Sequence, residues 1–365
     1  AVDQRLAGQI AERFFGQPAS KLTLIGITGT NGKTTTATIT QHLLRAAGRK
    51  PGLLGTVHLD TGHEGGPRAA ELTTPGAIDL SRLLAEMVAN GCDSAVMEVS
   101  SHALHQGRAD HLRFAAAGFT NLTQDHLDYH ASFDEYFAAK AGLFRRVLPE
   151  DGTAVINLDD PRGSEMRAIA AARGQRIITT GHGVGDLNLL NQRFDATGQD
   201  LRFAWDGETY QTRLELIGGF QAENVLLACG LVIASGETPE EVFRTLPHLT
   251  TVRGRMQLAA TRANGAAVFV DYAHTPDAVE TALTAMRPHV MGRIVVIVGA
   301  GGDRDATKRP LMGAAAARHA DIVVVTDDNP RSEDPASIRA AVMAGAVEAG
   351  TNAQITEVAD RAEAI

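Results

Sequence analysis

The sequence of 365 residues is poor in cysteine, contains only 5% aromatic residues and lacks any long apolar run. Its two cysteines, Cys92 and Cys229, cannot build a disulfide framework or a four-cysteine zinc site, which fits a reducing compartment. No apolar run is long enough to span a bilayer, and residues 1–15 carry charges of both signs where a signal peptide would be apolar. We therefore expect a cytoplasmic protein that has no membrane anchor.

The charge balance limits the class of partner. A formal net charge of -9 repels nucleic acid and acidic membranes, so any anionic ligand must be held by local groups. We expect small-molecule substrates, no nucleic acid and no membrane. With 44% hydrophobic and 21% charged residues the composition is that of a globular protein, and its length predicts two or more domains.

The two ends of the sequence predict that it belongs to a longer protein. The chain starts at Ala1 rather than at a methionine, and it stops at Ile365 inside a helix-like pattern. We expect segments beyond both ends.

Alternating apolar segments indicate an α/β protein. Residues 1–18 have the spacing of an amphipathic helix, residues 22–28 form a short apolar strand, and residues 35–48 have a helical pattern. Further strand-like runs with helical stretches between them predict a mostly parallel sheet with helices on both faces. These runs are residues 94–100, 115–122 and 153–159.

The pattern changes in the second half. Short alternating runs over residues 173–217 suggest an antiparallel excursion, and residues 219–236 return to helix. A glycine-containing loop near Val252–Arg255 precedes a second α/β series. We predict a linker helix at 1–20, a central domain at 21–251 and a carboxy-terminal domain at 252–365.

The strongest local motif is GTNGKTT at Gly29–Thr35, which lies between a predicted strand and a predicted helix. In that setting backbone N–H groups and the helix dipole can hold phosphate, Lys33 adds charge, and Thr34 offers a hydroxyl to Mg²⁺. The strict P-loop pattern requires glycine where Ile27 stands, so this is a shortened variant. The alternative reading is a glycine-rich turn without function.

Two further segments carry polar groups near predicted strand ends. Glu98 ends an apolar strand, at the edge where parallel sheets bind ligands, and is a candidate Mg²⁺ ligand. The segment NLTQDHLDYH, which contains His126, is followed by Lys140. There is a simpler interpretation of each. Glu98 would be a solvated cap, and the second segment would be a polar helix start with an exposed lysine.

Taken together, nine motifs resemble the Mur ligase family. The resemblance implies a central P-loop-type ATPase domain with a mostly parallel sheet, then a Rossmann-like α/β domain that is incomplete at its carboxy terminus. It also implies that the helix at 1–20 follows a missing UDP-binding domain. The motifs are GTNGKTT, ELTTP, MEVSSH, NLTQDHLDYH with Lys140, GGFQAENVLLA, RGRMQ, DYAHTPD, GGDRD and DDNPRSEDP.

The resemblance implies an ATP-dependent, amide-bond-forming ligase of peptidoglycan synthesis that works as a monomer. Its members activate a carboxylate as an acyl phosphate, which an amine then attacks. Lys33, Lys140 and His126 match catalytic positions, and Lys140 matches a lysine that is carbamylated. The matched ATP-binding positions are Gly29, Thr30, Asn31, Gly32, Lys33, Thr34, Thr35, Asn224, Arg255 and Asp271; the metal positions are Thr34, Glu98, His126 and Lys140.

The substrate positions follow from the same resemblance. Thr73, Thr74, Ser100, Gln106 and Arg108 match residues that hold a UDP-N-acetylmuramoyl-dipeptide. Arg304, Asp328, Asn329 and Arg331 match residues that hold the incoming amino acid, in the form found in members that add meso-diaminopimelate.

Arg331, helped by Arg304, is suited to the distal carboxylate of diaminopimelate, whereas the ammonium of lysine would be repelled. A dinucleotide reading of GAGGDRD would need glycine where Arg304 stands.

Three alternatives remain open from the sequence. A lysine-adding homologue or a ligase like folylpolyglutamate synthetase would share the phosphate loop. A noncatalytic nucleotide-binding subunit would have kept the fold, although Lys33, Thr34, Glu98, His126 and Lys140 are intact. A relative that works with a glutaminase and carries a cysteine zinc cluster is excluded, because two cysteines cannot form one.

Overall fold

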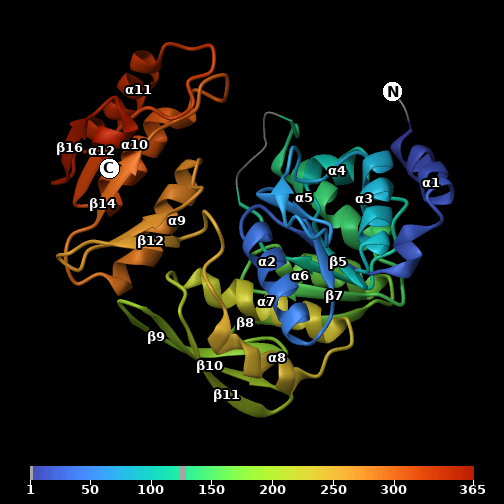
Figure 1. Ribbon diagram of the computed structural model, residues 1–365. Coiled ribbons are helices and arrows are strands. Elements are labelled where there is room, and N and C mark those ends of the chain that lie inside the picture. The colour runs from blue at the N-terminus through green and yellow to red at the C-terminus, as the bar shows by residue number, and fades with distance from the viewer. Residues whose placement is uncertain (1–2, 124–128) are drawn as a thin grey trace. The chain divides into compact units, whose positions relative to one another are not determined.

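The computed structural model describes residues 3–123 and 129–365. The chain divides into two compact units (Figure 1). The first comprises Ala1–Arg193, Asp200–Glu215 and Phe220–Arg253, and the second comprises Phe194–Gln199, Leu216–Gly219 and Gly254–Ile365.

A single mixed sheet organises the first unit. Among the described residues it has 11 strands in the order β11-β10-β9-β8-β7-β6-β1-β5-β2-β3-β4. From β9 to β2 every adjacent pair is parallel. The strands are β1 Thr23–Thr28, β2 Pro51–Leu54, β3 His58–Asp60, β4 Arg68–Ala69, β5 Ser94–Glu98, β6 Ala116–Phe119, β7 Thr153–Asn157, β8 Arg176–His182, β9 Leu187–Asp195, β10 Gly198–Trp205 and β11 Glu208–Leu214.

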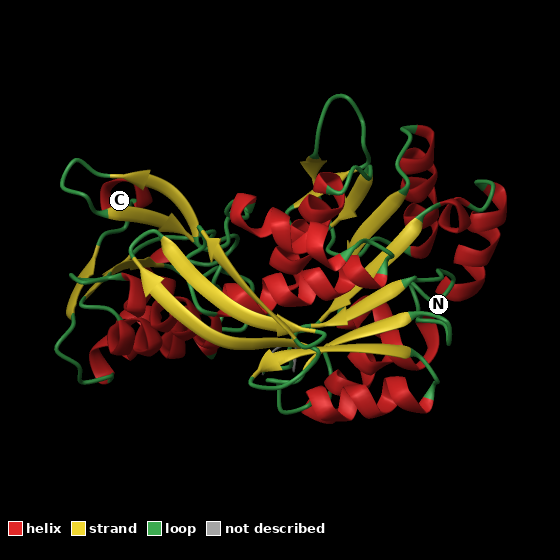
Figure 2. Cartoon of the chain, turned by 90° about the horizontal axis from the view of Figure 1, so that it is seen from below, coloured by secondary structure: helices red, strands yellow, loops and turns green. Residues whose placement is uncertain are grey.

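Helices cover both faces of the parallel strands in this unit (Figure 2). The chain moves one way along the sheet from β1 to β2 and the opposite way from β2 through β5, β6 and β7 to β8. Because crossovers are right-handed, α2 lies on one face of the sheet and α3 to α6 lie on the other. In agreement, α2 packs against α7, while α4 packs against α5. The helices are α1 Gln4–Phe14, α2 Lys33–Ala46, α3 Ala77–Ala89, α4 Ser101–His105, α5 Phe133–Gly142, α6 Gly163–Ala172, α7 Phe220–Ala234 and α8 Pro239–Thr245, with short helical turns at Pro18–Lys21, Leu143–Val147 and Leu246–His248.

The central strands are mostly apolar because both of their faces are covered. Leu24, Ile25 and Ile27 of β1 are all buried, as is every residue of β5. The register pairs Ile27 with Glu98, so the loop after β1 and the end of β5 lie at the same edge of the sheet. Asn157, the last residue of β7, lies at this edge as well. This carboxyl edge carries the candidate site.

The expectation of antiparallel strands over residues 173–217 was wrong for its first part. Strand β8 pairs parallel to both β7 and β9. The antiparallel part consists of β9, β10 and β11, which are sheet neighbours joined by the two-residue turns 196–197 and 206–207. Strand β8 follows helix α6, so it completes a further βαβ unit.

The second unit holds two small sheets. Strands β12 Gln257–Thr261 and β13 Ala267–Val270 pair antiparallel, whereas β14 Val295–Val298, β15 Ile322–Val325 and β16 Gln354–Glu357 form a parallel sheet. Its helices are α9 Pro276–Met286, α10 Lys308–His319, α11 Pro335–Glu348 and α12 Arg361–Ala364, with a helical turn at Arg287–His289. Val323, Val325, Met312 and Val342 contribute to its buried core.

A buried histidine of this unit contacts its two short segments, Phe194–Gln199 and Leu216–Gly219. His289 donates from Nδ1 to the carbonyl oxygen of Asp195 (2.6 Å) and accepts at Nε2 from the N–H of Gly218 (3.1 Å). Accepting at one nitrogen while donating from the other requires the neutral imidazole.

The predicted α/β class with a mostly parallel central sheet is confirmed. Among the described residues, no helix is long and apolar enough to cross a membrane.

Candidate active site

The phosphate loop occupies the turn between β1 and α2. Gly32 has a φ of 83°, and a Cβ there would lie 2.4 Å from Oδ1 of Asn224, so a residue without a side chain is required. The loop is held from the segment after β6, because the N–H groups of Thr30 and Asn31 donate to the carbonyl and side-chain oxygens of Asn121, each at 2.9 Å. A glycine-containing loop that leads into the N-terminus of a helix in this way is suited to bind an anion.

Lys33 begins α2 and folds back over this loop. Its Nζ donates to the carbonyl oxygens of Gly29 (2.9 Å) and Thr30 (2.8 Å). The ammonium thus lies where it can reach phosphate oxygens held by the loop. Thr35, predicted as a further ATP-binding residue, is buried at 4% exposure behind the loop.

Thr34 and Glu98 meet as the sequence predicted for a metal site. The Thr34 hydroxyl donates to the Glu98 carboxylate (3.1 Å), and Glu98 is only 1% exposed. The backbone N–H and hydroxyl of Thr56 also donate to Glu98, at 2.8 and 3.0 Å. A hydroxyl and a carboxylate that converge at a phosphate loop suit a hard divalent cation, so the residues present fit Mg²⁺. Thr56 carried no signal in the sequence.

Lys140 reaches the same loop from α5. It is 1% exposed, its Nζ donates to the carbonyl oxygen of Gly29 (2.6 Å), and it lies 4.3 Å from the centre of the Tyr136 ring. Tyr136 in turn is hydrogen-bonded to the Thr30 hydroxyl at 3.1 Å. The reading of Lys140 as an exposed helix lysine was therefore wrong. His126, the third predicted catalytic residue, lies outside the described residues.

A group of aromatic and imidazole rings lies beside this lysine. His130 is 3% exposed, and its ring centre is 5.7 Å from that of His102 and 5.8 Å from that of His105. Burial, followed by the charges of His102 and His105, lowers the pKa of His130. His130 lies in the NLTQDHLDYH motif and His102 in the MEVSSH motif, whereas His105 lies in neither.

The five predicted dipeptide-binding residues lie together at the same edge. The Thr74 hydroxyl donates to the carbonyl oxygen of Glu98 (2.9 Å) and accepts from the N–H of Ser100 (3.0 Å). Arg108 donates to the carbonyl oxygen of Thr74 (2.9 Å) and to the side chain of Gln106 (2.8 Å). Thr73 joins them through Thr56, with the two hydroxyls 3.0 Å apart. These hydroxyl, amide and guanidinium groups suit an anionic, hydroxyl-rich ligand.

Asn224 lies behind the phosphate loop on α7. It is 7% exposed, and its Oδ1 is 3.4 Å from the hydroxyl of Thr36, one turn into α2. In this position its side chain supports the loop, and its predicted role in binding ATP stays a prediction.

The neighbouring residue, Glu223, was missed. Burial raises its pKa to about 7, against the opposing charge of His182, which itself is hydrogen-bonded to Asp159 at 2.8 Å. The carboxyl groups of Asp159 and Glu223 and the His182 ring come within 4.8 Å of one another. No spacing rule predicts this group, because its members come from β8, α7 and the loop after β7.

The remaining predicted residues belong to the second unit and are described within it. Asp271 accepts from the N–H groups of Met256 (2.7 Å) and Ala273 (2.9 Å), and the Arg255 guanidinium lies 4.8 Å from the centre of the Tyr272 ring. Both therefore lie around the end of β13.

Arg304, Asp328, Asn329 and Arg331 lie in the loops that follow β14 and β15. The carbonyl oxygen of Asn329 accepts from the N–H of Gly302 (2.9 Å), which joins the two loops. Arg304 and Arg331 are both exposed, and Nη1 of Arg331 donates to the carbonyl oxygen of Gly302. Their guanidinium groups are thus open to an anionic ligand.

Two family models match this chain. The Mur ligase middle domain matches residues 27–232, and the Mur ligase glutamate ligase domain matches residues 254–365. Among curated relatives, the UDP-N-acetylmuramoyl-L-alanyl-D-glutamate--2,6-diaminopimelate ligase of Caulobacter vibrioides is 43% identical over 360 residues, covering 97% of this chain and 72% of the relative. The enzyme of that name from Synechococcus elongatus is 44% identical over 359 residues, covering 98% and 71%.

Solved structures show the same likeness. A structure of a UDP-N-acetylmuramoyl-L-alanyl-D-glutamate--2,6-diaminopimelate ligase matches with a TM-score of 0.70 and 31% identity, covering 99% of this chain and 73% of that one. Mycobacterium tuberculosis folylpolyglutamate synthase, solved with ADP and AMPPCP, matches with a TM-score of 0.78 but only 22% identity, covering 99% and 86%. The second likeness concerns the fold alone.

Proposed function

This chain belongs to the Mur ligase family, and from that premise we propose that it is the ATP-dependent ligase that adds meso-diaminopimelate to UDP-N-acetylmuramoyl-L-alanyl-D-glutamate in peptidoglycan synthesis. The observation that carries the proposal is the meeting of Lys33, Thr34 and Glu98 at one phosphate loop, in a chain 43% identical to a relative of that name. We further propose that it acts as a monomer in the cytoplasm.

ATP supplies the phosphoryl group that activates the substrate carboxylate. The loop residues Gly29 to Thr35 would hold its phosphates through backbone N–H groups, and Lys33 would exchange its contacts with Gly29 and Thr30 for phosphate oxygens. The roles of Asn224, Arg255 and Asp271 at the rest of the nucleotide are part of the same proposal.

Thr34 and Glu98 would hold a Mg²⁺ ion, which neutralises charge on the transferred phosphoryl group when bound. Glu98 is kept in place for this by Thr56, whose two donors leave the carboxylate little freedom. Orientation in advance is what a catalytic ligand requires.

Lys140 is proposed to act as a carbamate. Its amine would add carbon dioxide and release a proton, which replaces a buried cation by an anion. Two lysine Nζ atoms now share the carbonyl oxygen of Gly29, so removing one of the two positive charges relieves repulsion. With His126, the anion would support a second metal ion.

The muramoyl-dipeptide would bind at Thr73, Thr74, Ser100, Gln106 and Arg108. Diaminopimelate would be selected in the second unit, where Arg331 and Arg304 would pair with its distal carboxylate and Asp328 and Asn329 would contact its amino-acid end. Lysine places an ammonium at the same point, which two guanidinium groups repel.

The amino-acid specificity is tested by Arg331→Ala in the full-length protein. Losing a charge-assisted contact of about 1.5–3 kcal/mol lowers kcat/KM for diaminopimelate by about 10- to 150-fold. Phosphate release is measured with ATP, the UDP-muramoyl-dipeptide and either diaminopimelate or lysine. The control is Arg318→Ala, an exposed arginine of α10, which is expected to leave the rate unchanged.

The outcomes separate the alternatives. Equal turnover of lysine and diaminopimelate by the wild-type protein contradicts the proposed specificity. Turnover of a folate with glutamate would instead identify a folylpolyglutamate synthetase-like ligase, and absence of turnover with each of these substrates would favour a nucleotide-binding subunit.

A further inference from the structure

The loops that follow β14 and β15 lie backbone against backbone. Strands β14 and β15 are parallel neighbours, so both loops leave the sheet at its carboxyl edge. A Cβ on Gly302 would lie 1.8 Å from the carbonyl oxygen of Pro330, so only glycine permits this approach. The loops behave as one structural feature, which we call the paired loops (residues 299–305 and 326–334).

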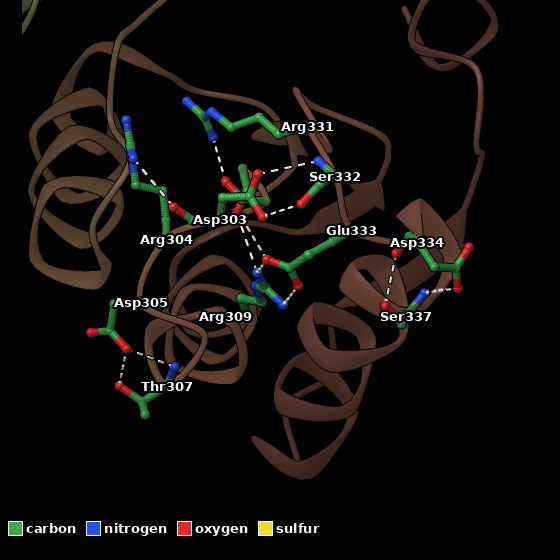
Figure 3. Close-up of polar contacts among 12 residues, drawn as sticks. Asp303, Arg304, Asp305, Thr307, Arg309, Arg331, Ser332, Glu333, Asp334 and Ser337 are labelled. Carbon is green, nitrogen blue, oxygen red and sulfur yellow. Dashed lines mark hydrogen bonds and ion pairs between the residues drawn. The ribbon is translucent and has the colours of Figure 1, made fainter.

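A buried arginine joins helix α10 to the paired loops. Arg309 is 5% exposed, and its Nη2 and Nη1 lie 2.7 and 2.9 Å from the two carboxylate oxygens of Glu333 (Figure 3). This bidentate geometry is the most directional that an ion pair can have. The same Glu333 carboxylate accepts from the N–H of Asp303 at 2.6 Å. One carboxylate thus connects the helix and both loops.

The backbone of the paired loops is held in an unfavourable conformation at two places. Asp303 and Arg331 both have a φ of 51°, a left-handed value that costs free energy for a residue with a side chain. Such a conformation persists only when its surroundings fix it. Asp303 also accepts from the hydroxyl (2.6 Å) and N–H (3.2 Å) of Ser332, so the residue after Arg331 is fixed too.

Arg331 therefore stands between fixed neighbours. On one side, Asn329 and Pro330 pack on Gly302; on the other, Ser332 and Glu333 are tied to Asp303 and Arg309. If Glu333 lost its charge, Arg309 would be a buried cation without its anion, and the link between α10 and the loops would loosen. The backbone at Arg331 could then relax, and its guanidinium would move.

We infer that Arg309 and Glu333 are positioning residues for amino-acid selection, which set the guanidinium of Arg331 against the distal carboxylate of the incoming amino acid. This inference rests on the proposed function, which assigns that carboxylate to Arg331. Neither residue touches the substrate in this scheme. Their effect appears in the affinity for one substrate, not in the chemical step.

The test compares Glu333→Gln with the wild type in the full-length protein. Glutamine keeps the size of the side chain and an acceptor for Asp303, but removes the charge that pairs with Arg309. We expect KM for diaminopimelate to rise about tenfold or more, while kcat stays within about threefold and KM for ATP and the muramoyl-dipeptide is unchanged. The ratio of kcat/KM for diaminopimelate over lysine is expected to fall by about tenfold, because a displaced guanidinium repels lysine less.

The matched control is Asp321→Asn. Asp321 pairs with Arg287 at 2.8 Å in the same unit, but it precedes β15 and so lies at the opposite edge of the sheet. It is expected to leave every KM within about twofold of the wild type, since the paired loops are untouched. Equal effects of Glu333→Gln and Asp321→Asn, or equal rises in all three KM values, would overturn the inference.

Thermal melting shows whether Glu333→Gln is folded. If it is not, a second variant tests the inference. Arg309→Lys keeps a buried cation but loses the bidentate pair, and it is expected to raise KM for diaminopimelate in the same direction by a smaller factor. An unchanged KM in Arg309→Lys overturns the inference. If the proposed function is wrong, the wild-type protein itself will not use diaminopimelate. If the wild type uses diaminopimelate and only Arg331→Ala impairs this activity, the proposed function stands and the positioning role of Arg309 and Glu333 fails.

Discussion

Glu98 in the first unit and Glu333 in the second lie at corresponding places, each near the carboxyl edge of a parallel sheet, yet their partners differ in kind. Glu98 accepts from two hydroxyls and a backbone N–H, whereas Glu333 pairs with a guanidinium. Neutral donors orient a carboxylate without cancelling its charge, so the carboxylate of Glu98 suits a cation. The charge of Glu333 is already matched, which suits a structural connection between loops. The comparison teaches that a carboxylate's partners, not its place on the sheet, indicate its task.

Replacing Lys33 tests whether the first unit carries the chemistry, and should give the largest effect. Lys33→Ala removes the cation that lies over the phosphate loop, so kcat should fall by about 10³-fold, or roughly 4 kcal/mol of transition-state stabilisation. The KM for diaminopimelate should change little, because the paired loops are intact. Phosphate release at saturating substrates measures both, with Lys21→Ala, an exposed lysine of the same unit, as control. Full activity of Lys33→Ala would favour a noncatalytic subunit.

Replacing Glu98 tests whether its neutral partners prepare it for a metal ion. Glu98→Gln keeps the shape but removes the charge, and the Mg²⁺ concentration for half-maximal activity should rise about 10- to 100-fold. A titration of activity with Mg²⁺ checks this. The control is Glu86→Gln, since Glu86 is paired with Arg68 on the surface of the same unit. If Glu98→Gln had an unchanged Mg²⁺ dependence, the metal site would be contradicted. Glu98 would then have a structural role, as Glu333 does.

Glu223 of the first unit and Glu333 of the second differ in the sign of their contribution to the pH dependence of stability, which is the smallest effect. Burial raises the folded-state pKa of Glu223 from 4.5 to about 7, so its contribution to stability is present below pH 4.5 and is lost as pH rises to about 7. Hydrogen bonds from Arg309 lower the pKa of Glu333, so its contribution is present above pH 4.5 and is lost as pH falls.

Thermal unfolding between pH 4 and 8 measures this difference. The ionisation of Glu223 should lower the stability of the wild type by roughly 1–2 kcal/mol between about pH 4.5 and 7, after allowance for solvent screening. Glu223→Gln should not show this decrease. Glu333→Gln should lower the stability most above pH 4.5, and its difference from the wild type should shrink as pH falls below 4.5. The same slope in Glu223→Gln and wild type would show that Glu223 ionises normally.

The sequence predicted features that depend on nearby residues. A run of apolar residues followed by GTNGKTT predicted strand, loop and helix, and the structure has β1, the loop and α2 there. The contact of Thr34 with Glu98 followed from placing both at strand ends on one edge of a parallel sheet. The sequence did not predict that β8 is parallel, because its short mixture of polar and apolar residues was grouped with the hairpin strands that follow, although its four central residues are buried.

Contacts between distant segments were decided by the tertiary structure. Lys140 was recognised through a motif, but that its Nζ is buried against Gly29 depends on how α5 packs. The pair of Arg309 and Glu333 joins a helix to a loop 24 residues away, and Asp303 lies 30 residues from the same carboxylate.

By itself, the sequence determined which groups this protein can use: a glycine loop with its lysine, a carboxylate after a buried strand, and arginines after two later strands. Only the tertiary structure decided which charges are matched within the protein and which are left for a ligand. The physical reason is that local patterns depend on spacing along the chain, whereas the pairing of charges depends on strand order and register, which bring together residues that no spacing connects.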